Sequence, residues 1–394
     1  MAGGDETAPL TCRREDFFLP EGLHYLNCAY MAPLPRATER AVVDGLRRKR
    51  APTGIGPDDF FEDAEEVRRR FARLVGGSPE RVAILPSASY GIAVAARNLP
   101  VERGDTVVVT HEQFPGNVYA WRRVAAESGA EVVTVAPPEG VGPGGGGRGA
   151  AWNRRLLEAV DRRTAVVALP HVHWTDGTRF DLEAVSARAR DVGAAVVVDG
   201  TQSVGALPFR VGDVRPDALV CAGYKWLLAP YATAVAWFGP RFDDGVPLEE
   251  TWMGREDSHD FQHLVDYRDA YQPGARRYDV GEVANFALLP GLLTSLGLVL
   301  AWGPERIQAY AAHLVEELVE LALERGFALE EPACRGAHLF GIRMRSDVEL
   351  GALKAALDEA GVVASLRGTA LRVSPHAYNG RADIGALMEV LAGV

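Results

Sequence analysis

Between Arg81 and Phe238 the sequence alternates between short apolar runs rich in β-branched residues and longer segments with helical periodicity. These runs are apolar on both faces, which is typical of strands buried inside a mostly parallel sheet. Seven such runs occur, at residues 82–85, 106–110, 131–135, 165–170, 195–199, 218–222 and 232–238. The pattern predicts an α/β fold whose large domain is a doubly wound, mainly parallel seven-stranded sheet, with ligands bound beyond the carboxyl ends of the strands.

The rest of the chain predicts a second, smaller core. A long amphipathic helix is expected over residues 305–325, because Pro304 stands at its start and Gly326 just past its end. Shorter strand and helix patterns follow, up to a last helix over residues 383–391. We therefore expect three parts: an N-terminal segment (1–50) joining the small domain and the active site, a large cofactor-binding domain (51–290) and a small C-terminal α/β domain (291–394).

A glycine-rich segment interrupts the large domain. Residues 137–149 contain seven glycines and three prolines, a composition that disfavours regular structure. The segment lacks the Lys-Ser/Thr ending of a phosphate-binding P-loop. It is predicted to be a mobile surface loop.

The charge balance is acidic, with 42 Lys and Arg against 53 Asp and Glu and a net charge of −11. Such a field repels nucleic acids and anionic membranes, so neither is expected as a partner. The four cysteines are widely scattered, which is typical of reduced thiols and not of a disulfide framework or a zinc site. We see neither a signal-peptide core nor an apolar stretch long enough to span a bilayer, and we expect a soluble, cytoplasmic protein without a metal centre.

Two residues at predicted strand ends suggest the chemistry. Asp199 ends one apolar run, and Lys225 follows the next. Pyridoxal 5'-phosphate (PLP) enzymes need an amine that forms a Schiff base with the cofactor and a carboxylate that keeps its pyridine nitrogen protonated. Lys225 and Asp199 could supply these groups, although either residue alone is more often a helix cap or a surface charge.

Two further segments strengthen this interpretation. At Ser87, Ala88 and Ser89 a strand stops and a helix begins, so hydroxyls and free backbone N–H groups there suit a phosphate dianion, or serve only as an N-cap. Phe114, just after another strand, could stack on the cofactor ring or be an ordinary core residue. The combination favours the functional interpretation for both segments.

These segments belong to a longer ordered pattern. Its stretches are YLNCAYMAPLP near Tyr25, PSASYGI at Pro86, FPGNVYAW at Phe114, PHVHWTDG at Pro170, DGTQSVGA at Asp199, GYKWLLAP at Gly223, ARRYDVGE at Ala275 and LRVSPHAYN at Leu371. In this order they resemble the class V aminotransferase family of PLP-dependent enzymes, which includes cysteine desulfurases, kynureninases and isopenicillin N epimerase-like proteins, and they are most similar to the epimerase-like branch. The resemblance implies the PLP-dependent aspartate aminotransferase-like fold.

The resemblance also implies roles for single residues. Lys225 would be the lysine of the internal aldimine, and Asp199 the partner of the pyridinium nitrogen. The residues placed around the cofactor would be Ser87, Ala88, Ser89 and Tyr224 at the phosphate, Phe114 on the ring face, Trp174 at the cofactor edge and Gln202 at the phenolic oxygen. Arg372 would bind the substrate α-carboxylate with its planar guanidinium. Tyr30, Trp252 and Arg276 are further pocket candidates.

At some positions the sequence departs from the family pattern, and these departures reduce the number of activities expected for this chain. Desulfurases carry a nucleophilic cysteine shortly before the carboxylate-binding arginine, whereas residues 365–371 are SLRGTAL. Desulfurases also place a proton-shuttling histidine where this chain has Phe114, which cannot exchange a proton. Kynureninases have a histidine at the position of Gln202. His171 or His173 could help in proton transfer, but a buried histidine is more often only structural.

We therefore expect an enzyme that acts on a small-molecule α-amino acid through an external aldimine and a quinonoid. A β-eliminating carbon–sulfur lyase of specialised metabolism is favoured by family analogy. The alternatives are an aminotransferase, then an epimerase or a kynureninase-like hydrolase. The complete set of cofactor contacts argues against a non-catalytic PLP-binding protein. The resemblance also implies a homodimer.

Overall fold

The computed structural model describes residues 8–138 and 147–394. Its largest sheet has seven strands in the order β2-β8-β7-β6-β5-β3-β4. These strands are β2 (Val82–Leu85), β3 (Thr106–Thr110), β4 (Glu131–Val135), β5 (Thr164–Pro170), β6 (Ala195–Asp199), β7 (Ala218–Ala222) and β8 (Ala234–Phe238). Only β8 runs antiparallel to its neighbours in this sheet. The predicted α/β fold with a mainly parallel seven-stranded sheet is confirmed.

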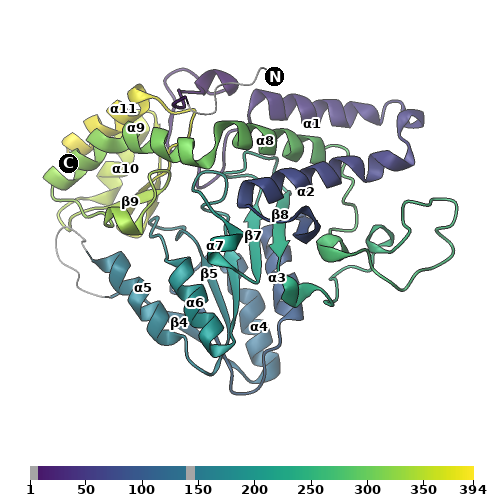
Figure 1. Ribbon diagram of the computed structural model, residues 1–394. Helices are drawn as coiled ribbons and strands as arrows, with labels where there is room; N and C mark the ends of the chain where they lie inside the picture. Colours follow the sequence, from purple (N-terminus) through teal and green to yellow (C-terminus); the bar gives the residue numbers. More distant parts are fainter. Residues whose placement is uncertain (1–7, 139–146) are drawn as a thin grey trace.

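Both faces of this sheet are covered by helices, which explains why its strands lack polar alternation. Along β6, Val196 and Val198 belong to the core on one face, and Ala195 and Val197 to the core on the other. The helices of this region are α3 (Ala88–Asn98), α4 (Tyr119–Ser128), α5 (Arg148–Ala159), α6 (Leu182–Val192) and the short α7 (Val211–Val214). In Figure 1, α5, α6 and α7 lie in front of the sheet, and α3 and α4 lie behind it.

A second layer of helices lies at one end of the sheet. It contains α1 (Arg36–Arg48), α2 (Glu62–Val75) and α8 (Leu289–Trp302), which pack against one another across the top of Figure 1. The following helix, α9 (Pro304–Glu324), begins and ends one residue before the predicted helix 305–325. The Pro304 start and the Gly326 stop are therefore where the sequence signals predicted them.

The C-terminal region has its own core and takes in part of the N-terminus. Strands β9 (Phe340–Arg343), β11 (Ser365–Arg367) and β12 (Ala370–Val373) form an antiparallel sheet. Helices α10 (Leu350–Glu359) and α11 (Arg381–Ala392) pack with it and with α9. Strand β1 (His24–Tyr25) pairs in parallel with β10 (Val362–Val363). This pairing joins the N-terminal segment to the C-terminal region, whereas the three-part division at residues 50 and 290 remains a prediction.

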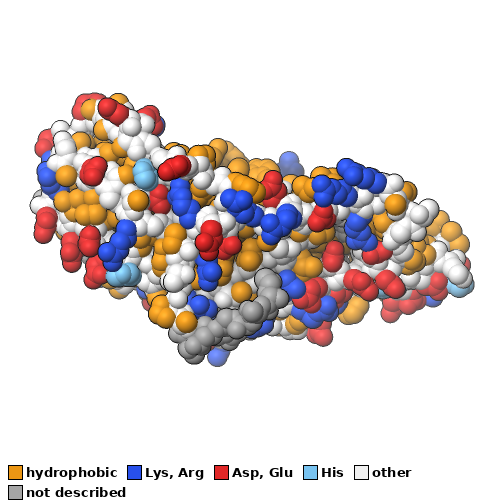
Figure 2. Space-filling model, turned by 90° about the horizontal axis from the view of Figure 1, so that it is seen from above, with side chains coloured by type: hydrophobic (Ala, Val, Ile, Leu, Met, Phe, Trp, Pro, Cys, Tyr) orange, Lys and Arg blue, Asp and Glu red, His pale blue; other side chains and the backbone are white. Residues whose placement is uncertain are grey.

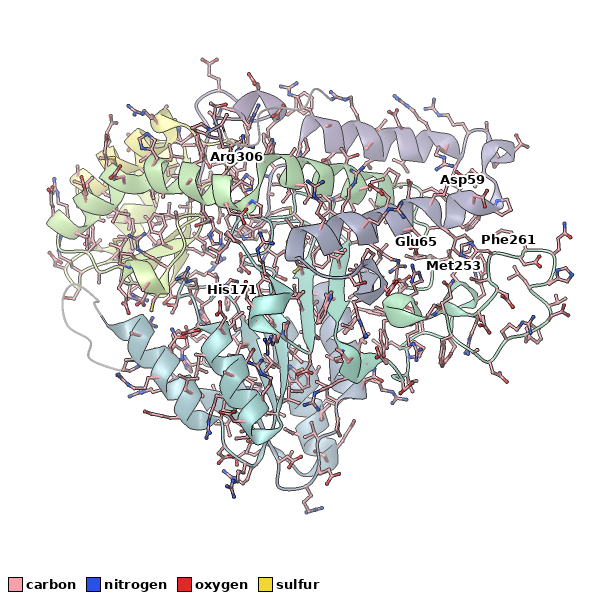
Figure 3. All side chains as sticks on the ribbon, viewed as in Figure 1. Asp59, Glu65, His171, Met253, Phe261 and Arg306 are labelled. Atoms are coloured by element: carbon pink, nitrogen blue, oxygen red, sulfur yellow. The ribbon has the colours of Figure 1, made fainter. Side chains whose placement is uncertain are left out.

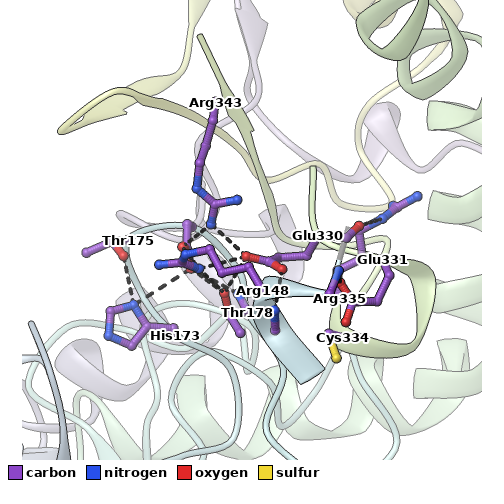
Figure 4. Close-up of polar contacts among 12 residues, drawn as sticks. Arg148, His173, Thr175, Thr178, Glu330, Glu331, Cys334, Arg335 and Arg343 are labelled. Carbon is purple, nitrogen blue, oxygen red and sulfur yellow. Dashed lines mark hydrogen bonds and ion pairs between the residues drawn. The ribbon is translucent and has the colours of Figure 1, made fainter. Parts of the chain in front are cut away.

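A buried ion network connects the large sheet domain with the C-terminal region (Figure 4). Arg148 donates to Asp176 at 3.0 Å and to Glu330 at 2.7 Å, and Arg343 pairs with the same two acids. Residues 139–146 of the glycine-rich segment lie outside the described residues. Its last two residues, however, form the first turn of α5, contrary to the prediction of a loop through Gly149. The reason is that Glu330 and Glu331 accept hydrogen bonds from N–H groups of this turn, including that of Gly149 at 2.8 Å.

The surface on the side of α1 and α8 carries charges of both signs. Figure 2 shows basic and acidic side chains interspersed with apolar ones along an elongated face. Within the described ranges, no helix combines the length and the apolar character needed to cross a bilayer.

Candidate active site

A cavity of about 260 Å³ lies at the carboxyl edge of the large sheet. Strands β3, β5, β6 and β7 are parallel, and β2 runs in the same direction because β8 reverses between it and β7. The segments that follow these five strands therefore meet at one edge. All nine residues expected to contact the cofactor line this cavity, namely Ser87, Ala88, Ser89, Phe114, Trp174, Asp199, Gln202, Tyr224 and Lys225.

Lys225 is a buried amine at the bottom of a turn after β7. It is only 5% exposed, and its Nζ lies 5.4 Å from the ring centre of Phe114 and 5.6 Å from that of Tyr224. Within the described chain, Nζ has no hydrogen bond and no ion pair. Burial lowers the pKa of Lys225 to about 8; the charge of Asp199 opposes this shift, and that of Arg372 adds to it. A substantial fraction of this amine is therefore neutral near physiological pH.

Asp199 is the only acid among the described residues that line the cavity. Its Oδ1 accepts a hydrogen bond from the backbone N–H of Thr201 at 3.0 Å. Burial raises the pKa of Asp199, although hydrogen bonding by Thr201 opposes the shift. No cationic side chain of the described residues forms an ion pair with it. A cationic group bound in the cavity would compensate this buried carboxyl.

Gln202 is fixed by the residues behind it. Its Nε2 donates to the carbonyl of Ala29 at 3.0 Å, and its Oε1 accepts from the indole Nε1 of Trp226 at 3.0 Å. An amide nitrogen carries two N–H groups, so one donor is left over for a ligand oxygen. The contact with Ala29 also brings the N-terminal segment to the back of the cavity.

One end of the cavity is suited to an anion. Ser87 is the N-cap of α3, and its Oγ accepts from the N–H of Tyr90 at 3.2 Å and lies 3.0 Å from Oγ of Ser89. The N–H groups of Ala88 and Ser89 belong to the first helical turn, where they have no acceptor within the helix. Free N–H groups at the positive end of a helix, together with two hydroxyls, can bind a phosphate.

Phe114 and Trp174 form an aromatic wall at the mouth. Their rings meet edge to face at a centroid distance of 5.6 Å, and Phe114 is partly exposed. The indole Nε1 of Trp174 donates to the carbonyl of Glu112 at 2.6 Å. Glu112 has a φ of 51°, a left-handed conformation that is uncommon for a residue other than glycine. The loop after β3 is thus held in a bent shape that presents Phe114 to the cavity.

Arg372 approaches from the C-terminal region. Its side chain is 1% exposed and donates from Nη1 to the carbonyl of Trp174 at 2.7 Å. Nη2 lies 3.3 Å from Oδ1 of Asn27 and 3.4 Å from Oγ of Ser365. In the described part of the chain its guanidinium meets no carboxylate, and its buried Nε has no partner. Burial lowers the pKa of Arg372 to about 10, and Arg367 adds to this shift.

Arg372, Tyr30 and Trp252 are not among the residues that line the cavity. Tyr30 is 58% exposed and follows Asn27, a contact of Arg372, by three residues. Trp252 packs in an aromatic cluster with Phe60, Phe61 and Phe261. Figure 3 shows the neighbours Met253 and Phe261 to the right of the sheet, in the long segment between β8 and α8. In this single chain, therefore, Trp252 does not reach Lys225, and its substrate-binding role remains a prediction.

Two histidines and one arginine that the sequence singled out make structural contacts. The ring nitrogens of His173 lie 2.7 Å from Oγ1 of Thr175 and 3.0 Å from the carbonyl of His111. Burial lowers the pKa of His171 to about 3, and its ring packs on Phe209 away from the cavity. Arg276 pairs with Glu65 through two hydrogen bonds of 2.8 and 2.6 Å.

Thr201 and Arg367 are among the residues near the site that were not predicted. Thr201 lines the cavity, donates to Asp199 and accepts from the N–H of Ala222 at 3.1 Å. Its position between Asp199 and Gln202 in DGTQ was a sufficient signal. Arg367 lies over the ring of Trp174 at 5.5 Å. Its only sequence signal was its place in the hairpin that also carries Arg372.

Comparison with known proteins agrees with this geometry. The family model described as Aminotransferase class-V matches residues 58–386. The uncharacterized aminotransferase YcbU of Bacillus subtilis is 26% identical over 340 residues, which are 86% of each chain. Isopenicillin N epimerase of Streptomyces clavuligerus is 26% identical over 384 residues, which are 93% of each chain. A solved structure of a C-DES mutant, with glycine covalently linked to its PLP cofactor, shares the fold with a TM-score of 0.82 at 19% identity and covers 97% of this chain and 99% of that chain.

The fold and the family match define the chain as a PLP-dependent enzyme. Because the match extends over residues 58–386, the chain belongs to the aminotransferase class-V family. The resemblance, the fold class and the cofactor predicted from the sequence are thereby confirmed.

Proposed function

We propose that Lys225 is the attachment site of PLP and that the enzyme acts on an α-amino acid. The observation that carries this proposal is the Nζ of the largely buried Lys225, which lines the cavity and lacks a hydrogen-bond partner within the described chain. A buried amine without a partner is costly unless a ligand compensates it. The cavity suits PLP at its other points as well, since Asp199 lacks a cation and α3 offers free N–H groups.

When bound, PLP supplies an electron-poor ring that stabilises negative charge on the substrate α-carbon. Asp199 would hold a proton on the ring nitrogen, and Ser87, Ala88 and Ser89 would hold the phosphate together with Tyr224. Phe114 would cover one face of the ring. Gln202 would donate its remaining N–H to the phenolic oxygen, in an orientation fixed by Trp226.

With an amino-acid substrate bound, the side chain of Lys225 would act as a base. Its lowered pKa of about 8 means that Nζ can accept the proton of the substrate α-carbon near neutral pH. Arg372 would bind the substrate carboxylate, because its buried guanidinium has no acid partner of its own in the described chain. The aromatic wall of Phe114 and Trp174 would keep water away from this proton transfer.

For the step that follows proton removal, we favour loss of a substituent from the β-carbon, as in a carbon–sulfur lyase of specialised metabolism. The support is analogy with relatives of varied chemistry, not a residue that selects this outcome. Transamination is the alternative, and the likeness to YcbU, named as an aminotransferase, supports it. Epimerisation and kynurenine hydrolysis are the less favoured alternatives.

The attachment is tested directly by borohydride reduction of the PLP-loaded protein. Mass spectrometry of its peptides should find the reduced cofactor on Lys225 and on no other lysine. A colourless protein that borohydride does not label at Lys225 would refute the proposal. The type of reaction is then determined by incubating the enzyme with amino acids and cysteine conjugates. Formation of pyruvate and a thiol indicates elimination. Formation of a keto acid and the amine form of the cofactor indicates transamination.

We also propose that the enzyme is a cytoplasmic homodimer. Tyr231, which lines the cavity, is 65% exposed, and Tyr30 and Tyr119 are 58% and 66% exposed. Exposed aromatic groups of this kind are common at protein interfaces. Light scattering during size exclusion should give twice the chain mass of 42.5 kDa. The four free thiols support a reducing compartment.

A further inference from the structure

Arg367 and Arg372 lie on the same face of one β-hairpin. Strands β11 and β12 pair antiparallel, with Ser365 opposite Arg372 and Arg367 opposite Ala370. Residues directly opposite each other, and residues two apart on a strand, share a face of the sheet. The contact between Ser365 Oγ and Arg372 Nη2 is on this face. Both arginines are therefore presented toward the side of the hairpin where Arg372 reaches Trp174.

Arg367 lies beside the aromatic wall of the cavity. Its guanidinium carbon is 5.5 Å from the ring centre of Trp174, whose other neighbour is Phe114. The charge of Arg367 contributes to lowering the pKa of both Lys225 and Arg372, after the larger effect of burial. Arg367 therefore belongs electrostatically to the same site.

The guanidinium of Arg367 is poorly compensated. Its Nη1 donates a hydrogen bond to the carbonyl of its own neighbour, Leu366, at 3.2 Å. Its buried Nε has no partner, and no carboxylate in the described ranges forms an ion pair with it. Stacking on Trp174 compensates the charge only in part, because cation–π contacts provide no hydrogen-bond acceptor. An unpaired, half-buried guanidinium beside a residue that lines the cavity is suited to binding an anion.

The proposed function does not use this charge. Bound PLP would engage Asp199 and the N-terminus of α3, and the substrate α-carboxylate would engage Arg372. Arg367 is left as a second cation, next to Trp174 in the aromatic wall. We infer that Arg367 binds a second anionic group, at the end of the substrate side chain, so that the enzyme selects acidic amino acids. This inference rests on the proposed function and names its substrate class.

The inference is tested by calorimetric binding of non-reacting acids to the PLP-loaded enzyme. Succinate, glutarate and adipate are each compared with their monoamides, which keep one carboxylate and replace the other by a neutral group of similar shape. For one chain length the diacid should bind at least about tenfold more tightly than its monoamide, as a charged hydrogen-bonded contact provides. Arg367→Gln should abolish this preference, and Arg367→Lys should keep part of it.

Arg345 provides a matched control. It also lies over an aromatic ring, that of Phe327 at 5.0 Å, but it pairs with Asp347 outside the cavity. Arg345→Gln should leave the diacid preference unchanged, whereas Arg372→Gln should weaken diacid and monoamide alike. The inference is overturned if no chain length shows the preference, or if Arg367→Gln retains it. It is also overturned if Arg367→Gln alters only dimerisation, which would give Arg367 an acid of the second subunit as its partner.

The two proposals can fail separately. Borohydride labelling of Lys225 in each variant reports whether the cofactor is attached. Labelled enzyme without a diacid preference overturns the role of Arg367 and leaves the proposed function intact. Unlabelled wild-type enzyme overturns the proposed function.

Discussion

Arg372 donates a 2.7 Å hydrogen bond to the main-chain carbonyl of Trp174, and this contact joins the C-terminal hairpin to the loop after β5. The same guanidinium is therefore held at the cavity by a main-chain group and not by an acid. Its charge remains available to a ligand, and the wall residue Trp174 is fixed by the residue proposed to bind substrate.

Replacing Lys225 by alanine should remove the base while leaving the cavity otherwise intact. We expect amino-acid turnover to fall by ~10²–10⁴-fold, the usual contribution of general acid–base catalysis. Borohydride should no longer fix PLP to the chain, and a steady-state assay with peptide mapping checks both results. Turnover within a few-fold of wild type in Lys225→Ala would contradict the proposed role.

Attachment of PLP should depend on pH through Lys225. Only the neutral amine attacks an aldehyde, and the pKa of about 8 places the transition well below that of an ordinary lysine. The rate constant of PLP attachment to the apoenzyme should therefore rise through pH 8 and level off above it, as measured by stopped-flow absorbance. Arg372→Gln removes a positive charge and should move this midpoint upward. A midpoint near 10 in the wild type would be inconsistent with a buried, partnerless amine.

The lowered pKa of Lys225 also makes the stability of the apoenzyme depend on pH. The native lysine of the apoenzyme loses its proton near pH 8, whereas the unfolded lysine keeps it up to about pH 10.5. Between these values the unfolded chain binds more protons, so this group makes the free energy of unfolding rise with pH. Urea titrations of the apoenzyme at pH 7.5 to 10 should show a steeper rise than those of Lys225→Met. Equal slopes in the two proteins would exclude a depressed lysine pKa.

Asp199→Asn should separate cofactor attachment from proton removal. The amide keeps the size of the side chain but cannot hold a positive charge on the ring nitrogen. We expect exchange of the substrate α-proton with deuterated solvent to slow by ~10²–10³-fold, comparable to the loss of a main stabilising group in a transition state. Lys225 should still be labelled by borohydride. Wild-type exchange rates in this variant would show that Asp199 is not the ring partner.

The buried pair of Arg68 and Asp279 should be important for folding. Arg68 is 2% exposed and donates from Nη1 to Oδ1 of Asp279 at 3.1 Å, and Asp279 also accepts from the N–H of Ile84 in β2 at 2.8 Å. Arg68→Ala leaves this carboxylate buried without its cation, at a cost of about 3–5 kcal/mol. The adjacent Arg69 pairs with Glu66 on the surface, so Arg69→Ala should cost less than about 1 kcal/mol. Urea unfolding compares the two, and similar losses would show that burial of the pair has little effect.

The strands were predictable because their signal is local. The runs that became β3, β6 and β7 are apolar on both faces and buried on both faces in the structure, so sequence and tertiary environment agree, whereas the edge strand β4 is partly exposed. The loop residues at the strand ends followed from that sheet, since parallel strands bring Asp199 and Lys225 to one edge. The roles assigned to these residues came from family resemblance and remain predictions.

Features that depend on distant residues were not predictable. The glycine-rich segment gives no local sign that Gly149 starts a helix, because the carboxylates that cap this helix belong to Glu330 and Glu331. The placement of Arg367 depends on Trp174, far away in the sequence. The sequence suggested Trp252 as a substrate-binding candidate. It gave no sign that Trp252 packs with Phe60 and Phe261, which are distant or non-adjacent in the sequence.

The parallel pairing of β1 with β10 constrains the order in which a newly synthesised chain can mature. His24 and Tyr25 leave the ribosome long before their partners Val362 and Val363, which lie far downstream in the sequence. The carbonyl of Ala29 that holds Gln202 lies in the same early segment. The large sheet can thus form before β10 has been translated, whereas the segment that closes the back of the cavity must wait for its pairing partner in β10.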